Sequence, residues 1–388
     1  MSATTGDRSA SNNNSTTFLD EYQKLLVSVG GNCGDEAVTD GDDGGGGGDS
    51  SSSPISSPIG ITTISTTDIT SSDTLLIVDV QHDFLPGGTF GVEEGFSILD
   101  GVCDLISKFD SAGGTIIATR DYHPRDHCSF TTQGGPFPCH CIQGTNGSFL
   151  HENIVTALQP LLADDEKSKR THVVYKAFTK DIDSFGAFQY TDDTFHPHTL
   201  VRGSSEEDTK SEIENINKYD QSTEDENDQF LKGDGWERRL SHNTDHCSLE
   251  WTGGYTLYSS NLMEDANAPP DVMSIFEKRP IGDLLPKITS KTGDDDEDDD
   301  DNNNGTSIGR LFVCGLAYDY CVIDSTVNFC RYKEKNNITT GGKCFIIQDL
   351  TRAAHIPGVG QFGSGFLTDP KIMYDKLQKN NIELMQFE

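Results

Sequence analysis

The stretch LFVCGLAYDYCV, residues 311–322, contains the pattern that decides the fold. Residues 311–314 are apolar and predict a short buried strand. Gly315 allows the backbone to turn sharply, and the apolar spacing over residues 318–332 then predicts a helix. Cys321 therefore lies in the first turn of a predicted helix.

Two interpretations of Cys321 follow from this position. Backbone N–H groups at a helix start are unpaired and the helix dipole favours negative charge, so the thiol could be held partly as thiolate, the form that attacks carbonyls. The alternative is a buried structural cysteine, because free cysteine is among the most buried residue types. From this stretch alone the structural interpretation is the stronger.

The same strand and helix unit recurs along the chain. Residues 75–78 form an apolar run that ends at Asp79, and a similar strand at residues 172–175 ends at Lys176. Further strands are predicted at residues 115–119 and 344–348, and helices at residues 98–109, 154–162 and 372–379. Strands that alternate with helices and are buried on both faces predict a doubly wound α/β sheet.

Three chemically distinct side chains follow the strand ends, namely Asp79, Lys176 and Cys321. The carboxyl ends of parallel strands converge on one crevice, so we expect these residues to meet there. A carboxylate, an ammonium and a thiol in contact would make an activated nucleophile. Taken singly, Asp79 could cap a turn and Lys176 could pair with a surface carboxylate, so the joint placement carries the hypothesis.

A second constellation consists of Asp121, His123 and His140. One carboxylate and two imidazoles suit zinc, iron or manganese, and His127 could be a further ligand. The alternative is that these are polar loop histidines that bind nothing. Spacing alone leaves both interpretations open.

Composition limits the classes of partner and the compartment. The chain has 388 residues, and 63 acidic against 29 basic residues give a net charge of -34, which argues against binding nucleic acid or an anionic membrane through a charged face. No run is long enough to span a membrane. Ten cysteines without paired CxxC spacing, and no apolar leader, predict reduced thiols in the cytoplasm, with the nucleus left open.

The pattern also predicts how the chain is divided. Residues 1–72 are rich in Ser, Thr, Asn, Asp and Gly and predict a disordered tail, interrupted by a short helix at residues 18–29. The core domain is predicted in two parts, residues 73–190 and 306–388. Between them, residues 191–305 predict a mostly disordered acidic insertion, of which residues 281–288 form a core helix.

Five stretches together resemble one known family. They are LLIVDVQHDFLPGG (75–88), TRDYHPRDHCSF (119–130), PFPCHCIQGT (136–145), YKAFTKDIDSFGAF (175–188) and VCGLAYDYCV (313–322). In this order they resemble the nicotinamidases of the isochorismatase-like cysteine hydrolase superfamily. Metal-free members of that superfamily share the Asp, Lys and Cys positions but lack the Asp-x-His and the later His.

The resemblance implies a three-layer α/β/α fold with a six-stranded parallel sheet. It implies a catalytic triad, a metal site for one divalent ion, an oxyanion hole after a cis peptide at residues 316–317, and aromatic rings around the substrate. The ion would be zinc, with iron or manganese as alternatives, and would hold the pyridine nitrogen of the substrate. The matching residues are Asp79, Lys176 and Cys321 for the triad, Asp121, His123 and His140 for the metal, the N–H groups of Ala317 and Cys321 for the oxyanion hole, and Phe84 and Phe137 for the rings.

The implied activity is hydrolysis of nicotinamide to nicotinate and ammonia in NAD salvage, through a thioester on Cys321. The alternatives are another amidase or ureide hydrolase of the superfamily, which the metal trio argues against, and a catalytically silent fold whose acidic insertion binds a partner. The resemblance leaves the choice between a monomer and a homo-oligomer open. Phe137 stands where many relatives have Trp, Cys139 precedes His140, and the long insertion has no counterpart in compact relatives.

Overall fold

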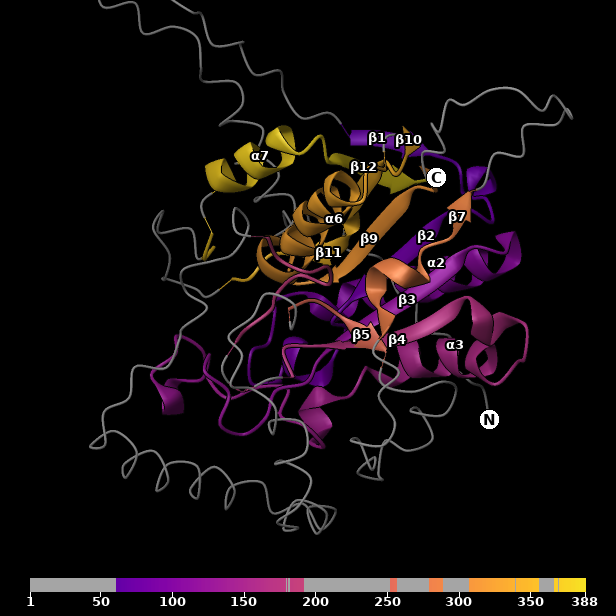
Figure 1. Cartoon of the computed structure of the whole chain (residues 1–388). Helices are drawn as coiled ribbons and strands as arrows, with labels where there is room; N and C mark the ends of the chain where they lie inside the picture. The colour runs from indigo at the N-terminus through magenta and orange to yellow at the C-terminus, as the bar shows by residue number, and fades with distance from the viewer. Residues whose placement is uncertain are drawn as a thin grey trace, which may run out of the picture.

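The computed structural model describes residues 61–178, 180, 182–191, 252–256, 279–288, 307–338, 340–355, 366–368 and 370–388 (Figure 1). Within these residues one nine-stranded sheet forms the centre, in the order β1-β12-β11-β9-β2-β3-β4-β5-β6. The strands are β1 (Ile61–Ile64), β2 (Thr74–Val78), β3 (Thr115–Asp121), β4 (Thr171–Lys176), β5 (Tyr255–Thr256), β6 (Arg279–Pro280), β9 (Leu311–Leu316), β11 (Cys344–Arg352) and β12 (Glu383–Phe387).

The predicted six-stranded parallel sheet is confirmed and is extended at both edges. The strands from β12 to β4 pair in parallel. β1 adds a further parallel strand beside β12, whereas β5 and β6 pair antiparallel beyond β4. The sixth parallel strand, β12, was not among the runs picked out from the sequence, because Glu383 and Gln386 interrupt its apolar pattern.

Helices cover both faces of the sheet, which gives three α/β/α layers. They are α2 (Leu99–Ala112), α3 (Glu152–Leu162), α6 (Ile323–Lys335) and α7 (Pro370–Lys379) (Figure 1). Leu75 and Ile77 of β2 pack in the cluster that contains α2 and α3, whereas Leu76 and Val78 pack in the cluster that contains α6 and α7. Because alternate residues of a strand point to opposite faces, a continuous apolar run is what a strand covered on both sides requires.

The strand order reverses between β2 and β9. From β2 the chain proceeds outward through β3 and β4, whereas β9 lies on the other side of β2 and is followed outward by β11 and β12. A crevice opens at the carboxyl ends of the strands at such a switch point. Asp79 directly follows β2, and Cys321 follows β9, so the two residues lie on either side of this crevice.

Parts of the predicted tail and insertion belong to the fold. Ile61–Ile64 of the predicted tail form β1, because pairing with β12 orders a segment whose own composition is polar. Within the predicted insertion, Thr252 is fully buried and Tyr255–Thr256 extend the sheet as β5. The predicted helix at residues 18–29 lies outside the described residues.

The core helix predicted at residues 281–288 is wrong. Ile281–Leu284 form one 3₁₀ turn, and Lys287–Ile288 form β7 of a small sheet with β8 (Ser307–Ile308) and β10 (Thr340–Gly341). Pro286 explains the difference, because the residue before a proline avoids the α conformation and proline donates no helical hydrogen bond. The apolar residues Ile281, Leu284 and Leu285 are still buried.

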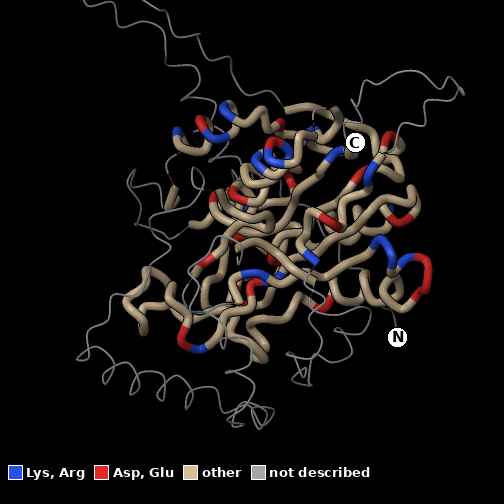
Figure 2. Tube along the Cα trace, viewed as in Figure 1, with Lys and Arg blue, Asp and Glu red and all other residues tan. Residues whose placement is uncertain are grey.

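Further 3₁₀ turns connect the main elements. They are Thr66–Asp68, His82–Phe84, Gly95–Ile98, Thr131–Gln133, Asn146–Ser148 and Lys167–Lys169. Among the residues that the structure describes, none of the helices has the length and apolar character needed to cross a membrane. In the view of Figure 2, basic and acidic residues are interspersed along the described chain.

Candidate active site

Lys176 is the centre of the predicted triad, and the structure brings all three residues together. Its Nζ lies 2.8 Å from Asp79 Oδ2 and 3.6 Å from Cys321 Sγ. The Lys176 and Asp79 side chains are fully buried, and Cys321 is 4% exposed. The Thr119 hydroxyl donates to Asp79 Oδ1 at 2.6 Å, which fixes the carboxylate next to the thiol.

Lys176 also contacts the second constellation. Its Nζ donates to Asp121 Oδ1, and Asp121 Oδ2 lies 3.5 Å from His123 Nε2. A single buried ammonium therefore joins the carboxylate of the triad to the carboxylate of the metal trio. Spacing in the sequence did not reveal this link, although β3 and β4 place Asp121 directly opposite Lys176.

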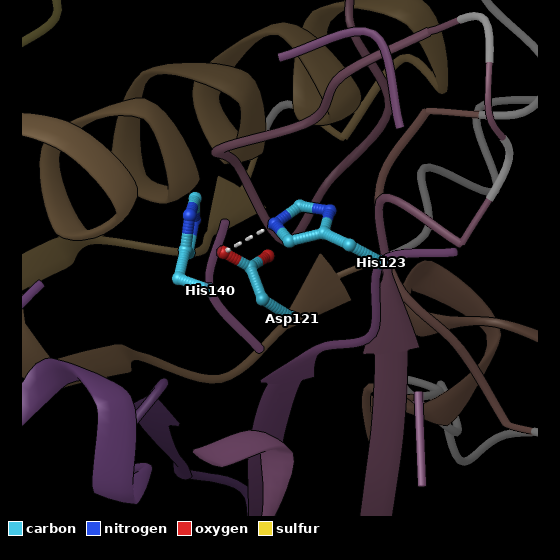
Figure 3. A group of neighbouring side chains, drawn as sticks. All are labelled: Asp121, His123 and His140. Carbon is cyan, nitrogen blue, oxygen red and sulfur yellow. Dashed lines mark ion pairs between the residues drawn. The ribbon is translucent and has the colours of Figure 1, made fainter. Parts of the chain in front are cut away.

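The predicted metal trio is assembled in one place (Figure 3). One potential ligand atom from each of Asp121, His123 and His140 lies within 4.8 Å of the others, and all three residues are buried. In Figure 3 the two imidazole rings lie on either side of the Asp121 carboxylate. Asp121 ends β3, while His123 and His140 come from the loop segments that follow it.

The hydrogen bonds of the two imidazoles fit a metal ion. His123 Nδ1 lies 3.1 Å from the carbonyl oxygen of Ala177, and His140 Nδ1 lies 2.7 Å from that of Pro138. A carbonyl can only accept, so Nδ1 carries a proton in both rings, which leaves Nε2 as the nitrogen that can bind a metal. His123 Nε2 is buried and has no hydrogen-bond partner among the described residues. Two lone pairs and a carboxylate directed at one point can hold a divalent cation.

His127 contributes to a neighbouring cluster rather than to this trio. Its Nδ1 lies 2.7 Å from Ser129 Oγ, and its Nε2 lies 3.3 Å from the Ile182 carbonyl oxygen. Its ring packs against His123 with a centroid distance of 4.1 Å. His127 thus supports the His123 ring, and its potential ligand atom groups with those of His123 and Asp183 rather than with the predicted trio.

The electrostatics of the triad differ from the expectation of a preformed thiolate. Burial raises the pKa of Cys321 well above its ordinary value, and although Lys176 lowers it, Asp79 raises it further. Burial also raises the pKa of Asp79 to about 6, against the opposing effect of Lys176. Burial alone would lower the pKa of Lys176, but Asp121 and Asp79 raise it above its ordinary value. The thiol is therefore protonated at neutral pH and needs a base, which Asp79 can supply.

The metal trio has its own charge balance. Burial alone would raise the pKa of Asp121, but Lys176 and His123 lower it below its ordinary value. Burial lowers the pKa of His140 to about 4, and His123 lowers it as well. Asp121 is thus ionised and His140 is neutral near pH 7, which are the forms that bind a metal.

Cys321 lies in an irregular turn. The strand β9 continues through Gly315 to Leu316, two residues beyond the end that the sequence pattern predicts, and the Leu316–Ala317 peptide bond is cis, as the resemblance implies. Residues Tyr318–Val322 form a π-helical turn that contains Cys321 and leads into α6. The N–H groups of Tyr320 and Val322 both donate to the Ala317 carbonyl oxygen.

Glycine is required at position 315. Its φ is +111°, and a Cβ there would lie 2.0 Å from the carbonyl oxygen of Val78 in the neighbouring strand. Three non-glycine residues also have positive φ next to site residues: Asp79 itself (47°), Cys141 after His140 (47°) and Ala177 after Lys176 (50°). Such conformations cost about 1 to 3 kcal/mol each and are typical of functional sites.

Aromatic rings surround His140. Phe84 and Phe137, both predicted from the resemblance, have ring centroids 5.5 Å and 6.2 Å from that of His140. Phe90, which was not predicted, lies 5.8 Å from both Phe137 and His140. Phe185 and Tyr320, also not predicted, pack against Phe137. These rings make an apolar wall beside the metal trio.

Comparison with known proteins gives a match to one family. Residues 73–184 match the isochorismatase domain family. This part of the chain is similar to isochorismatase domains. The matched residues include Asp79, Lys176 and the metal trio, while Cys321 lies beyond them.

Curated relatives are similar over the same region. The nicotinamidase of Escherichia coli is 35% identical over 129 residues, which cover 29% of this chain and 55% of the relative. The nicotinamidase of Acinetobacter baylyi is 31% identical over 134 residues, which cover 30% of this chain and 56% of the relative. The chain thus spans just over half the length of these relatives. Among solved structures, the pyrazinamidase of Pyrococcus horikoshii in complex with zinc is 19% identical, with a TM-score of 0.38, and the match covers 81% of this chain and 99% of that one.

Proposed function

We propose that this protein is a nicotinamidase, which hydrolyses nicotinamide to nicotinate and ammonia through a thioester on Cys321. The observation that carries this proposal is the contact of one buried ammonium, Lys176, with Asp79, Cys321 and Asp121. It unites a thiol and its base with residues suited to a metal. The similarity to curated nicotinamidases supports the same substrate.

The residues suited to a metal would bind one divalent ion. One carboxylate and two imidazoles suit zinc, with iron or manganese as alternatives, so we propose zinc held by Asp121, His123 and His140. The bound ion would supply a Lewis acid that anchors the pyridine nitrogen of the substrate. Phe84 and Phe137 would confine the ring between apolar faces, which leaves the carboxamide few orientations other than toward Cys321.

Asp79 would move the protons of the reaction. Its carboxylate takes the proton of the Cys321 thiol as the sulfur attacks the carboxamide carbon. The protonated Asp79 then gives that proton to the departing nitrogen, so ammonia leaves and a thioester remains. In the second half, Asp79 takes a proton from water, whose oxygen attacks the thioester carbon. As the bond between carbon and sulfur breaks, Asp79 returns its proton to the Cys321 sulfur. Nicotinate leaves and its acid proton passes to solvent, so the site returns to its first state.

Lys176 and the nucleophile turn would stabilise charge during these steps. Lys176 contacts both Asp79 and Cys321, so it favours the negative charge that passes between carboxylate and sulfur. The N–H groups of Ala317 and Cys321 would donate to the carbonyl oxygen as it becomes an oxyanion. Each such donor contributes about 3 kcal/mol in well-characterised oxyanion holes.

The test is ammonia release from nicotinamide by the purified full chain. We expect release that is lost on chelation, restored by adding zinc, and absent in Cys321→Ala. Cys314→Ala is a matched control, because Cys314 is also fully buried but belongs to the predicted strand rather than the site. Ammonia release by Cys321→Ala at the wild-type rate would disprove the thioester mechanism. Absence of ammonia release by the metal-loaded wild type would show that nicotinamide is not the substrate.

A further inference from the structure

The turn after β2 contacts the two chain segments that carry Asp121 and His140, through residues that the proposed mechanism does not use. Asp79 belongs to the triad, and the next two alternate positions are Gln81 and Asp83. Both side chains bind main-chain groups in segments that are far away in the sequence. Those segments contain Asp121 and His140.

Gln81 holds the main chain of Asp121 from both sides. Its side-chain Nε2 donates to the Asp121 carbonyl oxygen at 2.8 Å, and its Oε1 accepts from the Asp121 N–H at 2.8 Å. The same Nε2 donates to the Ser148 carbonyl oxygen at 2.8 Å. Gln81 is fully buried, so its amide has no water to replace these partners.

The contacts of Gln81 replace the strand pairing that the end of β3 lacks on this side. The ladder between β2 and β3 ends at the pair Ile77 and Ala118, whereas β3 runs on to Asp121. On its other side Asp121 remains paired with Lys176 of β4. The Gln81 amide thus takes the place of a strand partner at Asp121. The carboxylate of this residue contacts both Lys176 and His123.

Asp83 holds the second segment. Its Oδ2 accepts from the N–H of Cys141, the residue after His140, at 2.6 Å. Cys141 has a φ of 47°, so this bond stabilises a conformation that the residue would otherwise avoid. A Cβ at Gly147 would lie 2.0 Å from Asp83 Oδ2, so glycine there leaves room for the carboxylate. The Cys141 carbonyl oxygen in turn accepts from the N–H of His123 at 3.0 Å.

We propose that Gln81 and Asp83 are positioning residues that set the metal trio relative to the base Asp79. Gln81 fixes Asp121, and Asp83 fixes the segment of His140, so one short turn aligns the base with the metal ligands. The inference rests on the proposed metal site and extends the proposed function. Partners outside the first ligand sphere typically change metal affinity by about 10- to 100-fold.

The test is the zinc affinity of the full chain, measured for metal-free protein by competition with a chromophoric chelator. We expect Gln81→Met to weaken zinc binding about 10- to 100-fold, because Met matches Gln in length but cannot bind the Asp121 main chain. Gln348→Met is the matched control, since Gln348 is 1% exposed in β11 and its side-chain amide has no hydrogen-bond partner among the described residues. It should keep wild-type affinity. Equal zinc affinity of Gln81→Met and the wild type, with both folded, would overturn the role of Gln81.

Variants of Asp83 provide a second and independent test of the proposal. Asp83→Ala should weaken zinc binding, whereas Asp83→Asn should restore most of it, because an amide oxygen can still accept from the Cys141 N–H. Failure of the Asn variant to recover would mean that charge, rather than positioning, is what Asp83 supplies. Far-UV circular dichroism and a melting curve on each variant identify any that does not fold, and Gln81→Leu then replaces Gln81→Met with the same expected loss, because Leu also lacks the amide.

The zinc assay separates this inference from the proposed function, because it needs no substrate. If the wild type binds zinc and Gln81→Met binds it weakly, the inference stands even when nicotinamide is not hydrolysed. At saturating zinc, we further expect kcat of Gln81→Met to fall more than KM rises, since the shift of Asp121 also moves Lys176. A wild type that binds no divalent ion would overturn the inference directly.

Discussion

The ammonium of Lys176 donates to Asp121, a residue of the metal trio, as well as forming an ion pair with Asp79. Two carboxylates buried this close together would repel each other without the cation between them. The thiol site and the metal site therefore share one charge balance. Lys176 is at once part of the proposed catalytic triad and the cation that allows both carboxylates to stay ionised.

Replacing Lys176 with Met should destabilise the metal-free protein by about 3 to 5 kcal/mol, because it leaves two buried carboxylates without a counter-charge. Zinc should return part of this stability, since a divalent ion at Asp121 replaces the missing positive charge. Urea unfolding with and without zinc measures both effects. A Lys176→Met protein as stable as the wild type without metal would contradict the shared charge balance.

The pH dependence of kcat/KM should show one acidic limb near pH 6. The pKa of Asp79 is raised by burial to about 6, and its carboxylate is the form that accepts the thiol proton. As the pH falls below 6 the carboxylate gains a proton, and kcat/KM should fall about tenfold per pH unit. Initial rates with the zinc-loaded enzyme between pH 4.5 and 8 test this, in roughly half-unit steps.

The Asp79→Asn variant serves as the control for that profile. It should lack the limb and should be slow at every pH, because asparagine cannot accept the proton. A wild-type profile that stays flat down to pH 5 would assign the base to another group. A profile that rises instead toward high pH would indicate that the Cys321 thiol ionises without a base.

The sequence predicts much of this architecture, because its signals are local. Apolar runs such as residues 75–78 and 311–314 need no long-range information to be assigned to buried strands. The meeting of Asp79, Lys176 and Cys321 was predicted from their common place at the carboxyl ends of parallel strands. What could not be predicted depends on contacts between distant residues: β1 forms only because β12 is beside it, and Ile281–Leu284 are buried without being an α-helix.

The protonation state of Cys321 was harder to predict than its position. A helix start favours a thiolate at Cys321, but burial and the nearby Asp79 have the larger effect and raise the pKa. Gln81 and Asp83 gave no signal, because they act on main-chain groups of residues 40 and 58 positions away. Such partners can be found only once the fold places the segments together.

Arg310 precedes β9 and Asp73 precedes β2, so their ion pair links the starts of the two central strands. Its Nε and Nη2 lie 3.0 Å and 2.6 Å from the two carboxylate oxygens of Asp73, which is 2% exposed. Asp73→Asn should therefore lower the free energy of unfolding by about 1 to 3 kcal/mol at pH 7. Glu383→Gln is the control, because its ion pair with Lys343 is exposed and should contribute at most about 0.5 kcal/mol.

The same pair predicts a loss of stability in acid. Burial alone would raise the pKa of Asp73, but the hydrogen bonds from Arg310 and Thr70 lower it below the ordinary value of 3.8. A lowered folded-state pKa contributes stability that is present above 3.8 and is lost as the pH falls through the folded value. The difference in the free energy of unfolding between wild type and Asp73→Asn should thus shrink as the pH falls below 3.8. A difference that stays constant into strong acid would show that the charge of Asp73 is not what stabilises the strands.

Substrate choice should depend on the position of the ring nitrogen. Pyrazinamide has a nitrogen at the same ring position relative to the carboxamide as nicotinamide, so it should be hydrolysed at a comparable kcat/KM. Benzamide has no ring nitrogen and should be at least about a hundredfold poorer, because a site built to bind a polar atom is left unpaired without it. The Phe84 and Phe137 rings would contact all three compounds alike, so apolar packing cannot produce this difference. Ammonia release from the three amides by the zinc-loaded enzyme measures it, and equal rates for benzamide and nicotinamide would mean that the metal trio does not hold the ring.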